Sequence, residues 1–233
     1  HVLRAAAVVL MVGPLAACGA SLFGSDKPTV ETKPPEVLFN EANELLNKHD
    51  YTKAAERFEE VDRQHPYAPQ AREAILMSAF AYQKSDKLPE AVAAARRYLA
   101  LFPSSKEAAL AQHIIATAYY DRINDATRDQ GDTKRALVEL ETLVNRYPDS
   151  RYAADAKKRI RLARDVLAAS EMNVGRYYQQ KGEHLAAINR FRTVVTDYPN
   201  TAHVEEALMR LTECYYTLGI VNEAQTAAAV LGH

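Results

Sequence analysis

One cysteine near the start of the sequence stands where its sulfur could react. Cys18 directly follows Leu15-Ala16-Ala17, at the end of an apolar run over residues 5–15 that has the basic residue Arg4 before it. A cysteine sulfur is a nucleophile that can take up an acyl-carrying group, and small neighbours leave the backbone open to cleavage. The run of eleven residues is shorter than the about 20 that a bilayer-spanning helix needs. Its length and flanks predict a secretory signal peptide.

The same four residues, 15–18, resemble the bacterial lipobox, in which a leucine and two small residues precede a lipidated cysteine. The resemblance implies a signal peptide over residues 1–17 and a mature chain that starts at Cys18, with a diacylglyceryl group on the sulfur. Several acyl chains make such an anchor effectively permanent, whereas one chain binds membranes only marginally. Gly19 in the next position implies sorting to the outer membrane. The alternative is an ordinary signal peptide with a chance cysteine.

Elsewhere the sequence offers little that could form a catalytic or metal site. The seven histidines share no metal-ligand spacing, and the chain has no glycine-rich phosphate loop and no nucleophile elbow. Paired carboxylates such as Glu59-Glu60 and Glu205-Glu206 are typical of solvated helix faces. We therefore expect a protein that is not an enzyme and that needs no cofactor and no metal.

Charge and cysteine usage limit the partners further. Arg4 precedes Cys18, so the mature chain would carry 28 basic and 30 acidic residues, which argues against nucleic-acid binding.

Cys214 would be the only thiol left, and its place in an apolar helical pattern predicts a buried, inert side chain. Lys157, Arg161 and Arg164 fall on one helix face, which is either a solvated stripe or a contact for an acidic partner.

Composition divides the chain after the signal peptide. Residues 20–36 carry three prolines and no apolar periodicity, which predicts a flexible tether. We assign residues 18–36 to the lipidated start and the tether. From residue 37 to residue 233, alanine, leucine and tyrosine dominate and glycine is rare, which is typical of an all-helical domain. No segment after the signal peptide is apolar enough to span a bilayer.

The domain contains an internal repeat. Four prolines each have an alanine eight residues later and an apolar stripe at helical spacing before them, and a fifth stripe reaches the C-terminus. Each of the five copies has one residue between its two helices that suits the left-handed turn at the end of the first helix. In three of the five copies this residue is glycine. The prolines are Pro66, Pro103, Pro148 and Pro199, and the turn residues are His49, Asp86, Gly131, Gly182 and Gly219.

This helix-turn-helix pattern resembles the tetratricopeptide repeat. It predicts an all-α superhelical solenoid of five such repeats in which neighbouring units share one core. The prolines are 37, 45 and 51 residues apart, where a regular array has about 34. We expect an eight-residue insertion between the helices of the third unit, and an unusually long helix between the third proline and the fourth unit.

The lipobox, the tether and the repeats together resemble the BamD family of lipoproteins from the outer-membrane β-barrel assembly machine. The stretches that carry this resemblance are HPYAP, AFAYQK, DATRDQGDTKRAL, YPDSRYAADA and AAINRFRTVVTDYPNT. Residues 126–130 keep most of an Asp-Arg-Asp-Gln-type element of the family, with its first aspartate displaced to Asp125. His65 and Tyr67 depart from the Tyr-Pro-Phe start that is usual in the first of these stretches.

The resemblance implies a non-enzymatic scaffold that is lipid-anchored at the periplasmic face of the outer membrane. Its C-terminal units would dock BamA, the barrel component, with Arg190 facing it, and other lipoproteins of the machine would join. Its N-terminal units would offer a concave face to the aromatic-rich terminal segment of unfolded outer-membrane proteins. The implied partner contacts are Arg190, Arg128, Asp129 and Gln130, and the implied substrate contacts are Tyr82, Phe80 and Tyr119.

Each of these roles has an alternative. The three aromatic residues could serve only helix packing, and Arg190 could be only a solvated side chain. The whole protein could instead be another periplasmic repeat lipoprotein that coordinates envelope or division proteins. It could also be an enzyme accessory or a hydrolase, although the sequence shows no polar constellation for one.

Overall fold

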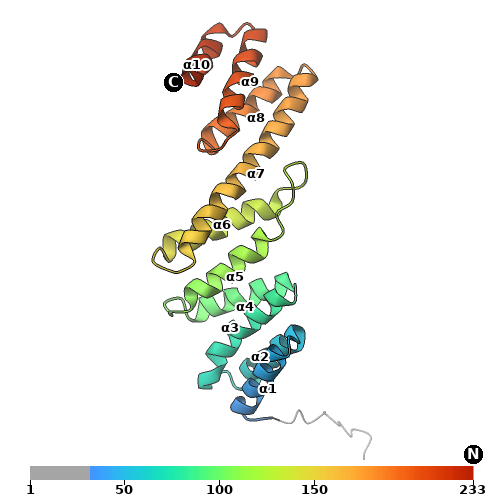
Figure 1. Ribbon diagram of the computed structural model, residues 1–233, viewed down its shortest axis with the longest axis vertical. Helices are drawn as coiled ribbons and strands as arrows, with labels where there is room; N and C mark the ends of the chain where they lie inside the picture. Colours follow the sequence, from blue (N-terminus) through green and yellow to red (C-terminus); the bar gives the residue numbers. More distant parts are fainter. Residues whose placement is uncertain (1–31, 233) are drawn as a thin grey trace, which may run out of the picture. The chain divides into compact units, whose positions relative to one another are not determined.

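A computed structural model describes residues 32–232, so the signal peptide, Cys18 and most of the tether lie outside the described residues. The described chain is all-helical, as predicted (Figure 1). Its ten helices are α1 (Pro35–Asn47), α2 (Tyr51–Gln64), α3 (Pro69–Lys84), α4 (Leu88–Leu101), α5 (Ala108–Tyr120), α6 (Gly131–Arg146), α7 (Ala153–Gln180), α8 (His184–Asp197), α9 (Val204–Thr217) and α10 (Val221–Leu231).

Helix α1 begins earlier than the sequence predicted. The domain was expected from residue 37, but Pro35 and Glu36 form the first turn of α1. Proline fits there because the first turn of a helix has no intrahelical partner for its N–H groups. The prolines that suggested a tether therefore include one that starts a helix.

The four repeated prolines end helices, as their spacing predicted. Pro66, Pro103, Pro148 and Pro199 each stand two residues beyond the last residue of α2, α4, α6 and α8. The residue before each proline has a φ between −127° and −135°, outside the helical region. A proline ring disfavours helical backbone in the residue before it, so the same local clash ends all four helices.

Four of the five predicted turn residues adopt the left-handed conformation. His49 and Asp86 have φ values of 60°, and Gly182 and Gly219 have values of 75° and 76°. Gly131 does not, and the prediction for it is wrong: it is the first residue of α6. The connection before α6 contains ten residues, 121–130, where the other four pairs have three-residue turns, so the insertion itself replaces the tight turn.

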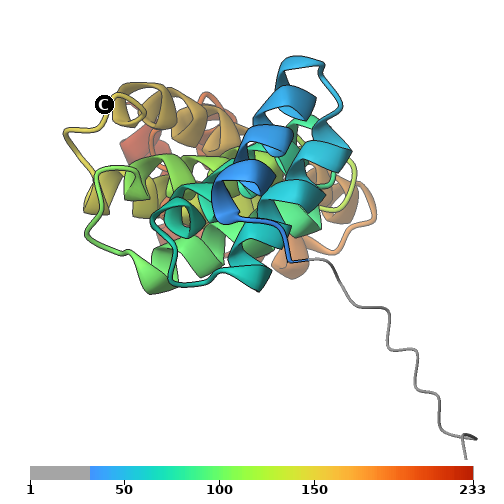
Figure 2. The same ribbon diagram turned by 90° about the horizontal axis from the view of Figure 1, so that it is seen from below.

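Helices that follow one another in sequence pack side by side, and α1 and α3, like α3 and α5, also touch (Figures 1 and 2). The buried side chains form three clusters, centred on α1–α5, on α5–α7 and on α7–α10. Helix α7 has 28 residues and is the predicted long helix. Its first half supplies Ile160 to the second cluster and its second half supplies Met172 to the third, so one continuous helix connects two cores.

Within residues 32–232, no helix combines the length and the apolar character needed to cross a bilayer.

Candidate functional site

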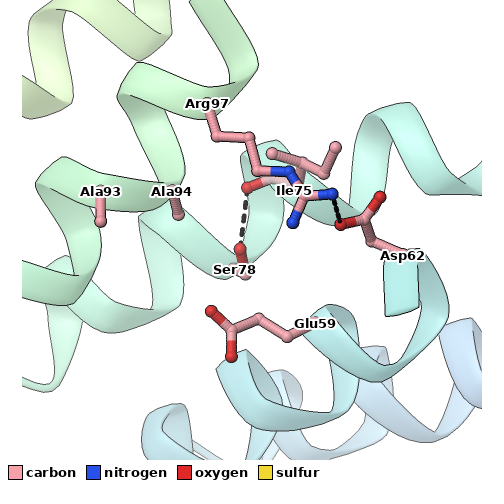
Figure 3. A pocket seen from close by; sticks show the side chains of 7 residues that line it. All are labelled: Glu59, Asp62, Ile75, Ser78, Ala93, Ala94 and Arg97. Carbon is pink, nitrogen blue, oxygen red and sulfur yellow. Dashed lines mark hydrogen bonds and ion pairs between the residues drawn. The ribbon is translucent and has the colours of Figure 1, made fainter. Parts of the chain in front are cut away.

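The first candidate site is a cavity between α2, α3 and α4. It has a volume of about 200 Å³, and Figure 3 shows the side chains that line it. Asp62 is only 6% exposed, and its Oδ2 lies 2.6 Å from Nη2 of Arg97 in an ion pair. A buried carboxylate needs such a partner, because its charge has been taken out of water. The pair therefore ties α2 to α4 in the wall of the cavity, and sequence reasoning missed it.

Tyr82 is buried in the core cluster of α1–α5. Its side chain is 5% exposed, and its hydroxyl donates to Oε2 of Glu59 at 2.9 Å. Burial raises the pKa of Tyr82, and the neighbouring Glu59 carboxylate raises it further. A ring buried to this extent cannot stack on an extended peptide without moving. In the structure Tyr82 packs in the core and holds Glu59, and its role as a substrate contact stays a prediction.

Phe80 is half-buried and packs against the core of α1–α5. The ammonium group of Lys84, one turn later in α3, lies 5.5 Å from the centre of the Phe80 ring. Phe80 thus keeps part of its ring accessible beside a positive charge, whereas the Tyr82 ring, which also has a lysine ammonium 6.0 Å from its centre, is buried.

The second candidate site is a cavity of about 320 Å³ between α4, α5 and the start of α6, which we call the Tyr119 cavity. Tyr119 forms part of its wall, and the guanidinium carbon of Arg135 lies 5.9 Å from the centre of the Tyr119 ring. This is the range in which a cation is attracted to an aromatic face. Its lining includes Leu88, Val92, Tyr119, Arg122, Asp132 and Arg135.

The insertion 121–130 forms the loop that leads into α6. Gln130 is 8% exposed; its amide nitrogen donates to the carbonyl oxygens of Asp125 and Arg128, and its amide oxygen accepts from Thr133. Oδ2 of Asp129 accepts from the N–H of Gly131 at 2.9 Å, which satisfies one free donor at the start of α6. Gln130 and Asp129 therefore shape the loop.

Arg128, like Asp129, is an exposed member of the predicted element. Its side chain is exposed, and its Nε lies 3.7 Å from Oδ2 of Asp125 in the same loop. An exposed pair of this kind contributes little to stability. Of the three loop residues predicted to touch a partner, Arg128 and Asp129 are exposed and Gln130 is buried, and all three partner contacts stay predictions.

Arg190 lies on α8, on the helix face that meets α7. Its side chain is 44% exposed, and Nη1 donates to Oε2 of Glu171 on α7 at 3.1 Å. A shallow hollow beside it is lined by Tyr178, Asn189 and Thr193. The structure therefore shows Arg190 as a partly exposed cation held in place by a carboxylate that the sequence did not single out.

The basic stripe on α7 is shorter than its spacing suggested. Nη2 of Arg164 donates to Oε1 of Glu141 on α6 at 2.6 Å, so this guanidinium is paired within the fold. Lys157 and Arg161 are exposed. The thiol of Cys214 is fully buried as predicted, and burial raises its pKa. No group of three acidic, histidine or cysteine side chains in residues 32–232 is placed to hold a metal ion.

The predicted contacts do not form one site. Tyr119 meets Arg135 in the Tyr119 cavity, and the loop with Arg128 leads into the same helix, α6. Arg190 belongs to α8, which packs with α7 and α9 in a different core.

Comparison with known proteins gives the following. A family model described as "YfiO: Outer membrane lipoprotein" matches residues 31–231. A relative from Caulobacter vibrioides, named "Outer membrane protein assembly factor BamD", is 38% identical over 97% of this chain and 74% of its own length. A relative of the same name from Rickettsia prowazekii is also 38% identical, over 86% of this chain and 80% of its own. A third, from Neisseria meningitidis, is 33% identical over 79% of this chain and 73% of its own.

Solved structures resemble the chain more distantly. The MamA protein has a TM-score of 0.43 and 17% identity, over 84% of this chain and 89% of its own. A tetratricopeptide repeat protein from Parabacteroides merdae has a TM-score of 0.42 and 15% identity, over 83% of this chain and 77% of its own. TM-scores and identities this low do not support an inference about what the chain does.

Proposed function

Because this chain belongs to the family of outer membrane lipoproteins whose curated relatives are BamD assembly factors, we propose that it is a non-enzymatic scaffold of outer-membrane protein assembly. In this role it is a member of the β-barrel assembly complex and associates with the outer membrane. The observation that carries the proposal is the family match, which extends from residue 31 to residue 231 and so includes all ten helices.

The proposed partner of the C-terminal half is the barrel component BamA. Arg190 supports this part of the proposal, because it presents a guanidinium that is partly exposed and already oriented by Glu171. Arginine is a frequent anchor in protein interfaces, since its planar group binds a carboxylate with two hydrogen bonds. Arg128 offers a second exposed cation in the loop before α6. A carboxylate-bearing domain of BamA is the partner that this chemistry fits.

The proposed role of the N-terminal half is to hold segments of unfolded outer-membrane proteins for delivery. Phe80 and Tyr119 support it, because both rings are partly accessible and each has a cation nearby. Tyr82 contributes indirectly, by fixing the Glu59 carboxylate at the first cavity. An aromatic ring that is half in contact with water suits a transient, amphipathic ligand.

The proposed attachment to the membrane is through lipid on Cys18. We expect Cys18→Ser to abolish acylation, because serine lacks the thiol that the lipid is transferred to, and to release the protein from the membrane fraction. Mass spectrometry of the N-terminal peptide and membrane fractionation measure the two effects. Cys214→Ser is the matched control: its sulfur is buried, so acylation should be unchanged. A wild-type peptide without acyl mass would remove this part of the proposal.

The experiment that tests the proposed function is a detergent pull-down of the tagged, full-length protein from its own envelope, followed by protein identification by mass. We expect a large outer-membrane barrel protein in stoichiometric amount. Recovery of peptidoglycan-associated or division proteins in its place would contradict the assembly role and support a different envelope scaffold.

A further inference from the structure

The first candidate site, the cavity between α2, α3 and α4, which we call the Asp62 cavity, has a buried floor and an exposed rim. Asp62, Ser78 and Ala94 are buried, whereas Glu59 and Ala93 are exposed. Figure 3 shows the side chains of α2, α3 and α4 that line this space. The cavity is therefore open on the side where α2 and α4 supply the exposed residues, and a side chain from outside can enter it there.

The Asp62 cavity carries more negative than positive charge. Its lining has two carboxylates, those of Glu59 and Asp62, and one guanidinium, that of Arg97. Within residues 32–232, Arg97 forms an ion pair with Asp62, and Glu59 forms none. The Oε2 of Glu59 accepts a hydrogen bond from the hydroxyl of Tyr82, which carries no charge. One negative charge in the cavity is therefore unbalanced, and a cation that enters is attracted to it.

The acceptors of the cavity suit an ammonium group. Oε1 of Glu59 takes part in no hydrogen bond within the described residues, and Asp62 contacts Arg97 through Oδ2. The hydroxyl of Ser78 donates to the carbonyl oxygen of Ile75 at 2.8 Å, so its own oxygen still has lone pairs to accept with. Two carboxylates and one hydroxyl thus offer three acceptors, which is the number of N–H donors on a lysine ammonium.

We propose that the Asp62 cavity binds the lysine side chain of a protein partner. The ammonium group donates to the carboxylates of Glu59 and Asp62 and to the hydroxyl of Ser78. The methylenes of the lysine pack against Ala93 and Ala94, whose small side chains leave room for them. The volume of about 200 Å³ is below the roughly 300–1,000 Å³ of pockets for whole small ligands, so it suits a single side chain. The inference goes beyond the proposed function, because that function assigns no partner to this cavity.

A lysine fits the cavity better than other cations do. The headgroup of phosphatidylethanolamine also ends in an ammonium, but its phosphate stands two carbons away and would face the Glu59 carboxylate. An arginine has five N–H donors in a rigid plane, and three acceptors would leave some of them unpaired. A metal ion lacks ligands, since no three acidic, histidine or cysteine side chains in residues 32–232 are placed to hold one.

The test is zero-length cross-linking of the full-length protein together with the proteins that it retains from its own envelope in detergent. A water-soluble carbodiimide joins a carboxylate to an adjacent amine as an amide and adds no spacer, so mass spectrometry of the peptides identifies both groups. We expect a cross-link from Glu59 or Asp62 to a lysine of another protein. A phosphatidylethanolamine mass on Glu59 would instead identify a lipid as the source of the ammonium.

Two variants test the charge and the space separately. Glu59→Gln removes the charge and keeps an oxygen that can accept from Tyr82. It should weaken binding of the cross-linked partner about tenfold, because a charge-assisted hydrogen bond is lost. Ala93→Phe keeps both carboxylates but fills the cavity from its rim, so the cross-link should disappear.

Glu56→Gln and Ala100→Phe are the matched controls. Both residues are exposed, they lie on the same two helices as Glu59 and Ala93, and neither lines the cavity. The two control variants should leave the cross-link and the binding of the partner as they are in the wild type.

Absence of a cross-link from Glu59 or Asp62 to another protein overturns the inference, whether or not a partner is retained. A lipid on Glu59 in place of a lysine also overturns it, and so does an equal loss of binding in Glu59→Gln and Glu56→Gln. Failure here is separate from failure of the proposed function. The pull-down can recover the barrel protein without a cross-link in this cavity, and a cross-link can form to a protein from outside the assembly complex.

Discussion

Replacing Arg190 with glutamate is expected to weaken docking of the barrel component by at least tenfold. A guanidinium that meets a partner's carboxylate contributes a charge-assisted interaction of about 1.5–3 kcal/mol, and the reversed charge adds repulsion. The new carboxylate would also face Glu171, whose Oε2 lies 3.1 Å from Nη1 in the native pair. The measurement is a titration of the purified protein with the periplasmic part of the barrel component, at two salt concentrations.

The stability of the fold should change little in this variant. Arg190 is 44% exposed and Glu171 is 20% exposed, and exposed pairs contribute at most about 1 kcal/mol. Arg192→Glu is the matched control, because Arg192 is exposed on the same helix but on a different face. It makes the same charge change and should leave docking close to that of the wild type.

A second control separates the positive charge from the pairing. Glu171→Gln removes the internal carboxylate and keeps the Arg190 guanidinium, so docking should persist. If Glu171→Gln weakens docking as strongly as Arg190→Glu, the effect comes from the contact between α7 and α8 and not from a partner's carboxylate. Unchanged affinity in Arg190→Glu, with normal helicity and melting, would contradict the assignment of Arg190 as a docking residue.

Features that depend on near neighbours in the sequence were predictable. The clash between a proline ring and the preceding residue ends α2, α4, α6 and α8 wherever the rest of the chain lies, so the prolines located these helix ends. The left-handed turns at His49 and Asp86 followed from their place in the repeat, although neither residue is glycine. Gly131 has the same position in the repeat, but it follows a ten-residue connection and is the first residue of α6.

Contacts between distant residues were not predictable in the same way. Asp62 and Arg97 stand 35 residues apart, and nothing in their spacing shows that a buried Asp62 pairs with Arg97 in the wall of one cavity. The Tyr119 cavity combines residues from α4, α5 and α6, and its two arginines and its aspartate come together only when the three helices are packed. For Tyr82, the position in the repeat was predictable from the sequence, but its burial was not. Only the packing of α2 against α3 shows that the ring is covered.

Replacing Gly175 with valine is expected to destabilise the C-terminal core by about 2 kcal/mol, within the usual range for an overpacked core. Gly175 is buried in the second half of α7, and a β-carbon there would lie 2.5 Å from Cε1 of Phe191 on α8. Phe191 is fully buried, so its ring has no free space to enter. Glycine in the middle of a helix normally costs stability, and here it allows α7 and α8 to approach each other.

Thermal and urea unfolding, followed by circular dichroism, measure this effect. Ala154→Val is the matched control, because Ala154 is exposed near the start of the same helix and the same β-branched side chain meets water there. Its cost should be no more than about 0.5 kcal/mol. A loss in Gly175→Val no larger than that in Ala154→Val would contradict the clash with Phe191, because replacing a glycine inside a helix otherwise improves helix propensity.

The double variant Gly175→Val with Phe191→Leu tests whether a clash with Phe191 causes the loss of stability. Leucine is smaller than phenylalanine, so the added side chain gains space, and the double variant should lose less stability than the two single variants together. Additive losses would contradict the contact. The same packing positions Arg190, the proposed docking residue, because Arg190 directly precedes Phe191 in α8 and reaches Glu171 in α7. Docking should therefore fall in Gly175→Val and recover in part in the double variant, which would tie the close approach of the two helices to partner binding.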